Sequence, residues 1–503
     1  MGASPALAPD LQGVLDEFRD RSGMPDVGFE VKQRAAGDVL VLHMANPTNR
    51  FFAILEAARE RHGSPTATIA RRATEPRLQS PEARLLQRAL AESLTIGRQS
   101  FGDDFFARYT KTVTGAEAVI TARAHHVVYG RRGAGKSSLL LYALKSCQRE
   151  GRPSAWLGMQ AYRDIGEAAL VPEVVAAVLS QVAGESAGGI VLPLRGDDTS
   201  RADSRRLLLR AREVLGAAAP AGATIFLDDF HLVSPDLQPP LLDAIYGLIR
   251  DTPSDLKLSA IESLTRTWDS EKHKGMEVGQ DLQQINLDLN LAAPDRALRH
   301  ISGILDAQAV YCGLESIRYL CNSDEVLTRL MWVSAGVPRD AVNNFAQAMA
   351  RDQSQGRAKV SVTSVNESAG SLLIAKEKEL ESDVASARSE ARADLRQVMD
   401  LVKSKCIGGK HGERQNAFLV ELRPSGRGYR AVRELVDLRL LHVIGEAISL
   451  GRAGRKFLPL ILDYGYYTGQ RRAQSVDLFN PQALRVRYRD LRKLPRLDPE
   501  AAL

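Results

Sequence analysis

Residues 125–144 read HHVVYGRRGAGKSSLLLYAL, an apolar stretch, a glycine-rich turn and a second apolar stretch. The turn GRRGAGKS, residues 130–137, fits the phosphate-loop pattern G-x-x-x-x-G-K-[ST] without a mismatch. HHVVYG is typical of a strand and SSLLLYAL of a helix, which is the context that such a loop needs. The glycines let the loop curl so that its backbone amides point at phosphate oxygens, beside the positive end of the following helix. The segment therefore predicts a nucleotide site.

The residue types of this loop predict how ATP and Mg²⁺ are held. Lys136 would reach the β- and γ-phosphates as a point charge, and the Ser137 hydroxyl would ligate the magnesium ion. The residues expected to line the nucleotide are Gly130, Arg131, Arg132, Gly133, Ala134, Gly135, Lys136, Ser137 and Ser138.

A second magnesium ligand is predicted by ATIFLDDF, an apolar strand that ends in Asp228 and Asp229. Asp228 would complete the metal site with Ser137. Asp229, directed at the γ-phosphate, would polarise the attacking water. ATP hydrolysis is therefore the expected chemistry.

Four stretches in this order, GRRGAGKSSLL, LDDFHLV, LKLSAIES and QQINLDLNL, resemble an AAA+ ATPase of the origin-recognition-complex type. Residues 334–370 are similar to the lid of that family, in which Gly-x-x-Arg begins a helix. The resemblance implies an α/β fold, with a parallel sheet flanked by helices, a helical lid and a C-terminal winged helix. It also implies that Arg339 is the lid arginine that touches the γ-phosphate, and that subunits associate through their ATP sites.

Further site residues follow only from the resemblance. The polar residue that ends the strand after the aspartates, called sensor 1, falls on Glu262 or Ser263, of which we prefer Ser263. The arginine offered to a neighbouring subunit's ATP is Arg266 or Arg250. Residues 114–117, Thr-Gly-Ala-Glu, would lie near the adenine.

The predicted elements divide the chain into five parts. They are a small α+β unit (1–75), the P-loop ATPase core (76–290), a helical lid with a long helix (291–405), a winged-helix domain (406–475) and a basic tail (476–503). The stripe Leu380, Val384, Ala387, Ala391, Leu395 and Val398 predicts a single helix over 376–402.

The winged-helix prediction comes from GYRAVRELVDLRLLHVI, an amphipathic helix, followed by a strand pair with a basic tip. The tip residues are Arg452, Arg455 and Lys456. From residue 401 onward, 20 Lys and Arg face 10 Asp and Glu, although the whole chain carries only +6. In an extended tail, Arg485, Arg487 and Arg489 would lie on one side and contact DNA phosphates or pair with the protein body.

Composition excludes several classes of protein. Four scattered cysteines, Cys147, Cys312, Cys321 and Cys406, predict buried free thiols rather than disulfides or a zinc site. The start shows no signal peptide, and no apolar run reaches the ~18 residues of a membrane span. We therefore expect a cytoplasmic protein with no membrane partner.

Two functions are compatible with these patterns. In the first, ATP drives assembly and lid closure on double-stranded DNA. In the second, a STAND-type signalling switch, which also carries Asp-Asp, the winged helix binds protein and residues 1–75 form a partner-binding module. Because many AAA+ enzymes have Asp-Glu, the shorter Asp229 predicts slow hydrolysis in either case. No small-substrate acceptor site follows the aspartates, so a metabolic kinase ranks third.

Overall fold

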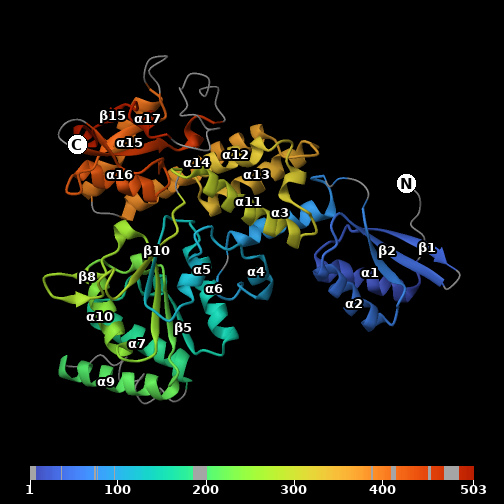
Figure 1. Cartoon of the computed structure of the whole chain (residues 1–503), viewed down its shortest axis with the longest axis horizontal. Helices are drawn as coiled ribbons and strands as arrows, with labels where there is room; N and C mark the ends of the chain where they lie inside the picture. Colours follow the sequence, from blue (N-terminus) through green and yellow to red (C-terminus); the bar gives the residue numbers. More distant parts are fainter. Residues whose placement is uncertain are drawn as a thin grey trace.

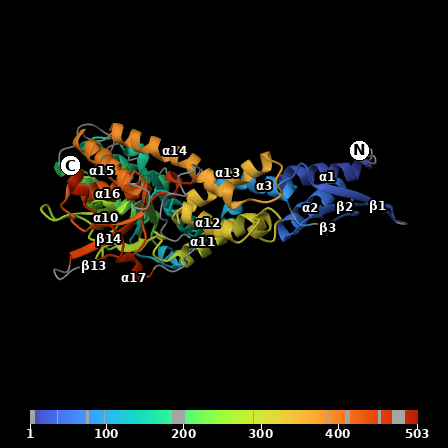
Figure 2. The same cartoon turned by 90° about the horizontal axis from the view of Figure 1, so that it is seen from above.

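The computed structural model describes residues 7–34, 37–72, 75, 77–95, 97–184, 201–289, 291–386, 389–408, 415–450, 455–468 and 487–503. Figure 1 shows an elongated molecule, with the N-terminal unit at one end. At the other end, the part predicted to be the ATPase core, called the ATPase lobe below, is stacked with the C-terminal lobe. Lid helices connect the two ends, and the turned view in Figure 2 shows the N-terminal unit continuing the long axis beyond them.

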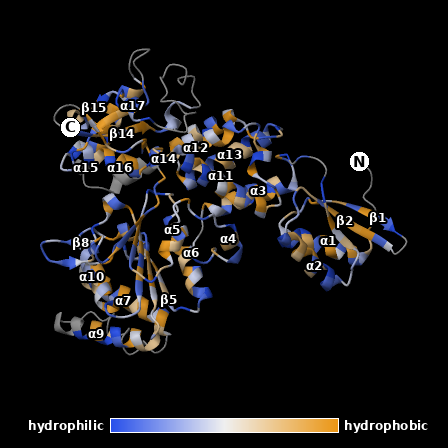
Figure 3. Ribbon diagram, in the orientation of Figure 1, coloured by the Kyte–Doolittle hydropathy of each residue, from blue (hydrophilic) through white to orange (hydrophobic). Residues whose placement is uncertain are grey.

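A five-stranded parallel sheet forms the ATPase lobe, as predicted. Its strands, in spatial order, are β10 Gln283–Asn286, β4 His126–Tyr129, β7 Asp255–Ala260, β6 Thr224–Asp228 and β5 Ser154–Gly158. Neighbouring residues Val127 and Val128 belong to different apolar clusters, one on each face of the sheet. Both faces are thus covered, and Figure 3 shows apolar stretches in these strands that polar residues interrupt.

Helices cover the sheet on both sides. They are α4 Asp103–Arg108, α5 Ala116–Ile120 and α6 Lys136–Arg149 for one face, and α7 Glu167–Ala183, α9 Arg201–Ala218 and α10 Gln238–Ile249 for the other. A short antiparallel pair, β8 Trp268–Asp269 and β9 Lys274–Gly275, lies next to α10. Cys147 on α6 and the other three cysteines are free and buried, which confirms that prediction.

The lid consists of α11 Pro294–Tyr311, α12 Glu325–Val333 and α13 Pro338–Ser354. One more helix belongs with it: α3 Pro81–Ser93, placed by sequence in the ATPase core, packs against α11 and α13. Its buried Leu86 and Leu90 join the apolar core that the lid shares with the N-terminal unit. The N-terminal unit and the lid therefore form one continuous body.

The long helix predicted over 376–402 is wrong, because the chain forms two helices there, α14 Val362–Ser386 and α15 Ser389–Cys406. Lys403 Nζ lies 2.8 Å from Glu377 Oε1. In a straight helix these residues would be about 39 Å apart, at 1.5 Å rise per residue. The two helices therefore fold back on each other. Ala387, one of the predicted stripe residues, lies outside the described part.

The C-terminal lobe carries the predicted helix followed by a strand pair. It comprises β11 Ala417–Glu421, α16 Arg427–Asp437, β12 Leu441–Val443, β13 Ile448–Leu450 and β14 Arg455–Leu462. β12 and β13 both pair with β14, which pairs in turn with β11. Arg455 and Lys456 open β14 and are exposed, whereas Arg452 lies outside the described residues.

The end of the chain is folded onto this lobe. It forms α17 Tyr488–Leu491, β15 Arg496–Leu497, which pairs parallel to β11, and the short helix η8 Pro499–Ala502. Leu491, Leu494 and Leu497 are buried in the core of the lobe. The predicted extended tail is therefore wrong for residues 487–503. Arg487 and Arg489 are exposed there, and Arg485 lies outside the described residues.

The N-terminal unit is a two-layer α+β fold, as predicted. Its elements are α1 Pro9–Ser22, β1 Gly28–Arg34, β2 Gly37–Met44, α2 Asn49–His62 and β3 Ala67–Arg71. The hairpin β1–β2 is joined by β3, which runs parallel to β2. Within the described residues, no helix of the protein is both long and apolar enough to cross a bilayer.

Candidate nucleotide-binding site

The phosphate loop lies between β4 and α6, where the motif places it. Gly133 and Gly135 have φ of 81° and 97°, in the left-handed region that favours glycine. Gly133 also meets the lid, because a Cβ there would lie 2.8 Å from Arg339 Cβ and 3.1 Å from Val337 Cγ1. The Arg339 backbone N–H donates to the Gly133 carbonyl at 3.2 Å. The lid is therefore packed directly on the loop.

Lys136, the first residue of α6, is buried beneath the loop. Its Nζ donates to the carbonyl oxygens of Gly130 at 2.8 Å and Arg131 at 3.2 Å. Burial lowers the pKa of Lys136, and the negative charges of Asp229, Asp288 and Asp228 only partly oppose that shift. A buried ammonium whose direct partners are neutral carbonyls is suited to an anionic ligand.

The two predicted magnesium ligands lie together. Ser137 Oγ donates to Asp228 Oδ1 at 3.0 Å. Asp228 Oδ1 also accepts from the backbone N–H of Asp229 at 3.1 Å and from Ser259 Oγ at 2.6 Å. A carboxylate and a hydroxyl are oxygen donors of the kind that Mg²⁺ takes, so this pair fits the metal.

Ser259 on β7 is a site residue that the sequence analysis missed. It is paired with Val128 of β4, the strand that leads into the phosphate loop. Its hydroxyl donates to Asp228. The strand carries Asp255, Lys257 and Ser259 at alternate positions, so one polar face was visible in the sequence. Only Ser259 lies near the carboxyl end of the strand, where Asp228 ends β6.

Asp229 has a φ of 54°, which places a non-glycine residue in the left-handed region. Asp tolerates this conformation better than most residues. Burial and then the charge of Asp228 raise the pKa of Asp229, against the opposing effects of Lys136, Arg132 and Arg339. A carboxylate with a raised pKa at a cavity wall is a candidate for handling the proton of a water.

Next to it, His231 was also missed by the sequence analysis. Burial lowers its pKa to about 3, helped by the charges of Lys136 and Arg132. The imidazole is therefore neutral at ordinary pH, and it lines the same cavity.

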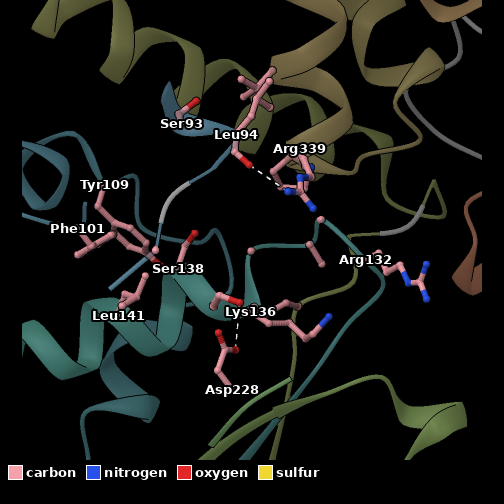
Figure 4. Close-up of a pocket in the computed structure, with 18 of the residues that line it drawn as sticks. Ser93, Leu94, Phe101, Tyr109, Arg132, Lys136, Ser138, Leu141, Asp228 and Arg339 are labelled. Carbon is pink, nitrogen blue, oxygen red and sulfur yellow. Dashed lines mark hydrogen bonds between the residues drawn. The ribbon is translucent and has the colours of Figure 1, made fainter. Parts of the chain in front are cut away.

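Arg339 reaches the cavity from α13. Its Nη2 donates to the carbonyl of Leu94, just after α3, at 3.0 Å. Figure 4 shows this bond, with Arg339 on the lid side of the loop and Asp228 on the opposite side. The structure thus brings the lid arginine to the predicted site and connects it to the end of α3.

The other candidates lie elsewhere. Ser263 is exposed, does not line the cavity, and donates to the carboxylate of Asp437 on α16. Glu262 is exposed as well, and it does not line the cavity either. Arg266 pairs with Asp269 at 3.2 Å, and the Arg250 guanidinium lies 5.7 Å from the Tyr246 ring. Neither arginine lines the cavity.

The cavity has a volume of about 720 Å³, within the range of small-molecule sites. Its phosphate end consists of residues 132–138, the two aspartates and Arg339. Its other end is aromatic and apolar, lined by Phe101, Phe105, Tyr109, Leu141, Ile304 and Val342. Thr110 and Thr112 line it, whereas the predicted segment 114–117 does not. The two ends suit the phosphates and the base of a nucleotide.

No family model and no curated protein sequence matches the chain. Among solved structures, the Aeropyrum pernix ORC1 protein in complex with DNA is 16% identical over 69% of this chain and 87% of that chain, with a TM-score of 0.36. Drosophila ORC bound to DNA is 12% identical over 82% of this chain and 98% of that chain, with a TM-score of 0.36. A Walker-type ATPase of Pyrococcus abyssi is 14% identical over 71% of this chain and 96% of that chain, with a TM-score of 0.41. These similarities are too distant to support a conclusion about activity.

The parallel sheet, the phosphate loop at the end of β4, the aspartates at the end of β6 and the helical lid form one nucleotide-binding unit. This arrangement is a P-loop nucleotide-binding fold.

Arg131 of the phosphate loop does not line the nucleotide cavity. Its backbone N–H and its Nε donate to Asp288 Oδ1 at 2.9 and 3.2 Å. Its guanidinium donates to the carbonyls of Leu289 and Ala335 and lies 3.3 Å from His442 Nδ1 on β12. The phosphate loop is thus connected directly to the lid and to the C-terminal lobe.

From His442 a buried chain of charges continues, which we call the joint network: Arg131, Asp340, Lys376, Arg439, His442 and Asp463. His442 Nε2 lies 2.9 Å from Asp463 Oδ2. Lys376 Nζ on α14 lies 2.7 Å from Asp463 and 3.0 Å from Asp340, which also pairs with Arg439. Asp340 follows Arg339 on α13, so the joint network connects the loop, the lid, α14 and the C-terminal lobe.

The charges of the joint network support one another. Burial alone would raise the pKa of Asp463, but Lys376 and His442 hold it well below its usual range. Burial likewise opposes the charge of Lys376, yet Asp340 and Asp463 raise its pKa. Burial lowers the pKa of His442 to about 4, despite Asp463, so this ring is neutral at ordinary pH.

Proposed function

We propose that this protein is an AAA+ ATPase that binds ATP and Mg²⁺, hydrolyses ATP slowly, and acts on DNA through its C-terminal winged-helix lobe. The observation that carries the proposal is the meeting of Lys136, Ser137 and Asp228 in a cavity that residues of the lid also line. Unrelated segments converge there in the arrangement that phosphate binding requires.

Backbone amides of residues 132–138 and the positive end of α6 would hold the phosphates, with Lys136 as the charged partner. Ser137 and Asp228 would hold Mg²⁺, which neutralises charge on the β- and γ-phosphates when bound. Asp229 would orient water and accept its proton, as its raised pKa allows. An Asp side chain is about one methylene shorter than Glu, so we expect slow turnover.

The lid would respond to the nucleotide through Arg339. Its guanidinium bonds to the Leu94 carbonyl at the cavity wall. A γ-phosphate offers a stronger, charged acceptor than a carbonyl, so ATP would compete for this arginine. Because α3 packs on the lid and leads to the N-terminal unit, an exchange of partners would be transmitted to both.

The support for DNA is the uneven charge. Twenty Lys and Arg against ten Asp and Glu follow residue 400, on a helix-and-hairpin lobe of the kind that enters DNA grooves. The test is ATP turnover and duplex binding at moderate salt. Binding of a 30-base-pair duplex, with a change in ATP turnover, is expected; absence of both would refute action on DNA.

A STAND-type signalling switch is the second candidate, favoured by the joint network between the phosphate loop and the C-terminal lobe. Here, nucleotide exchange would release the lobe for self-association, with Arg266 or Arg250 offered to the neighbouring ATP site and a protein bound to the N-terminal unit. ATP-dependent conversion of an ADP-loaded monomer to a ring or dimer without DNA would support this candidate.

A further inference from the structure

The helix expected to enter DNA is covered at its N-terminal end by the C-terminal end of the chain. In helix-turn-helix domains, the first residues of the recognition helix contact base edges. In this lobe α16 holds that position, but the Glu500 carboxylate accepts from the backbone N–H groups of Gly428 and Tyr429, both at 3.1 Å. A Cβ at Gly428 would lie 2.6 Å from the Pro499 carbonyl carbon, so the chain end is packed tightly there.

The surroundings of α16 are also engaged. Arg427 makes two hydrogen bonds to Asp394 of α15, at 3.0 and 2.7 Å. At the other end of the helix, Asp437 accepts from Ser263 of the ATPase lobe. Asp498 lies near Arg423, and Glu500 adds negative charge where a phosphate would otherwise approach. The first turn of α16 is thus covered by the chain end, and its free N–H groups are already bonded to the Glu500 carboxylate.

The same chain end builds a basic surface elsewhere. Its exposed basic side chains form what we call the tail face: Arg487, Arg489, Arg492, Lys493 and Arg496. Over residues 487–497 five basic residues accompany a single acidic one, Asp490. Figure 1 shows α17 and β15 on the side of the lobe away from the ATPase sheet, with α16 nearer to it.

The tail face is a fixed surface rather than a solvated flexible segment. β15 pairs with Leu419 and Val420 of β11. Arg496 lies over the Phe457 ring at 5.1 Å, and Arg492 over the Tyr488 ring at 4.9 Å. Exposed cations held on a strand and a helical turn offer a preformed basic surface for the phosphates of a duplex.

We propose that the C-terminal lobe binds the phosphate backbone of duplex DNA with the tail face, not by inserting α16 into a groove. This inference rests on the proposed action on DNA and specifies its surface. The contacts are to phosphates, so binding is strongly salt-dependent and only weakly sequence-dependent.

The test uses full-length protein with ATP, Mg²⁺ and a 30-base-pair duplex, over a range of salt concentrations. The variant Arg492→Gln/Lys493→Gln removes two tail-face charges, and the control Arg430→Gln/Arg433→Gln removes two charges from α16. We expect the tail-face variant to bind about tenfold or more weakly, with the salt slope of log affinity reduced by about two. The α16 control should leave both quantities close to wild type.

The single variant Arg496→Gln, on β15, gives an independent check: the slope should fall by about one. If the α16 control loses the affinity while both tail-face variants retain it, the inference is wrong although the action on DNA stands. If the wild-type protein binds no duplex at low salt, the proposed action on DNA fails together with its surface.

Discussion

Lys136 and Lys376 are both buried lysines, yet their surroundings are opposite. Lys136 donates to two neutral carbonyls of the phosphate loop, and burial lowers its pKa. Lys376 lies between the carboxylates of Asp340 and Asp463, which raise its pKa above the usual value despite full burial. One charge is prepared for an anion from outside, and the other is already neutralised within the fold. The first belongs to a binding site and the second to a structural joint.

The largest expected effect separates these roles. Lys376→Met leaves Asp340 and Asp463 buried with fewer partners, so the free energy of unfolding should fall by about 3–5 kcal/mol. Lys136→Met removes a charge that burial disfavours, and should cost less than about 1 kcal/mol. Denaturant unfolding without nucleotide measures both. Equal losses of unfolding free energy in the two variants would contradict the distinction between a binding site and a structural joint.

The next prediction is that acid lowers the stability of the joint network. Folded His442 takes up its proton near pH 4, whereas in the unfolded chain it does so near pH 6.5. The unfolded state therefore binds more protons between these values, so stability is complete above pH 6.5 and falls as pH drops toward 4. The shift corresponds to roughly 3 kcal/mol for this residue.

His126 and His231 shift in the same direction and add to the loss. His442→Gln should therefore flatten, but not abolish, the decline in unfolding free energy between pH 6.5 and 4. An identical pH profile for variant and wild type would show that this ring does not report on the joint network.

A smaller effect is expected beside Lys136. Ser259→Ala removes the 2.6 Å hydrogen bond to Asp228 and should lower ATP turnover about fivefold, the equivalent of one hydrogen bond. Ser263→Ala, its matched control, should leave turnover unchanged because Ser263 does not line the cavity. Steady-state hydrolysis at saturating ATP measures the turnover of both variants. Unchanged turnover in Ser259→Ala with a loss in Ser263→Ala would support Ser263 as sensor 1.

The two lysines also show what the sequence could predict. Lys136 belongs to a motif of eight consecutive residues, so its neighbours Ser137 and the loop glycines follow from local spacing. Asp228 was found because it ends an apolar strand, and the helix and strand pair of the C-terminal lobe came from local periodicity.

Lys376, in contrast, reaches Asp340 and Asp463, which lie 36 and 87 residues away in sequence. No local pattern encodes such contacts. The same reason hid Ser259, which needs the strand register to reach Asp228, and Glu500, which caps a helix from the end of the chain. Arg131 fits the loop motif, but tertiary packing turns it toward His442.

The central claim is that Lys136 holds a triphosphate in the cavity below the lid. Calorimetric titration of ATP with Mg²⁺ into wild-type protein and Lys136→Ala measures it directly, with the melting temperature of each protein as the check on folding. We predict at least a 100-fold loss of affinity, with the melting temperature in the absence of nucleotide nearly unchanged. Equal affinity in a folded variant would contradict the account.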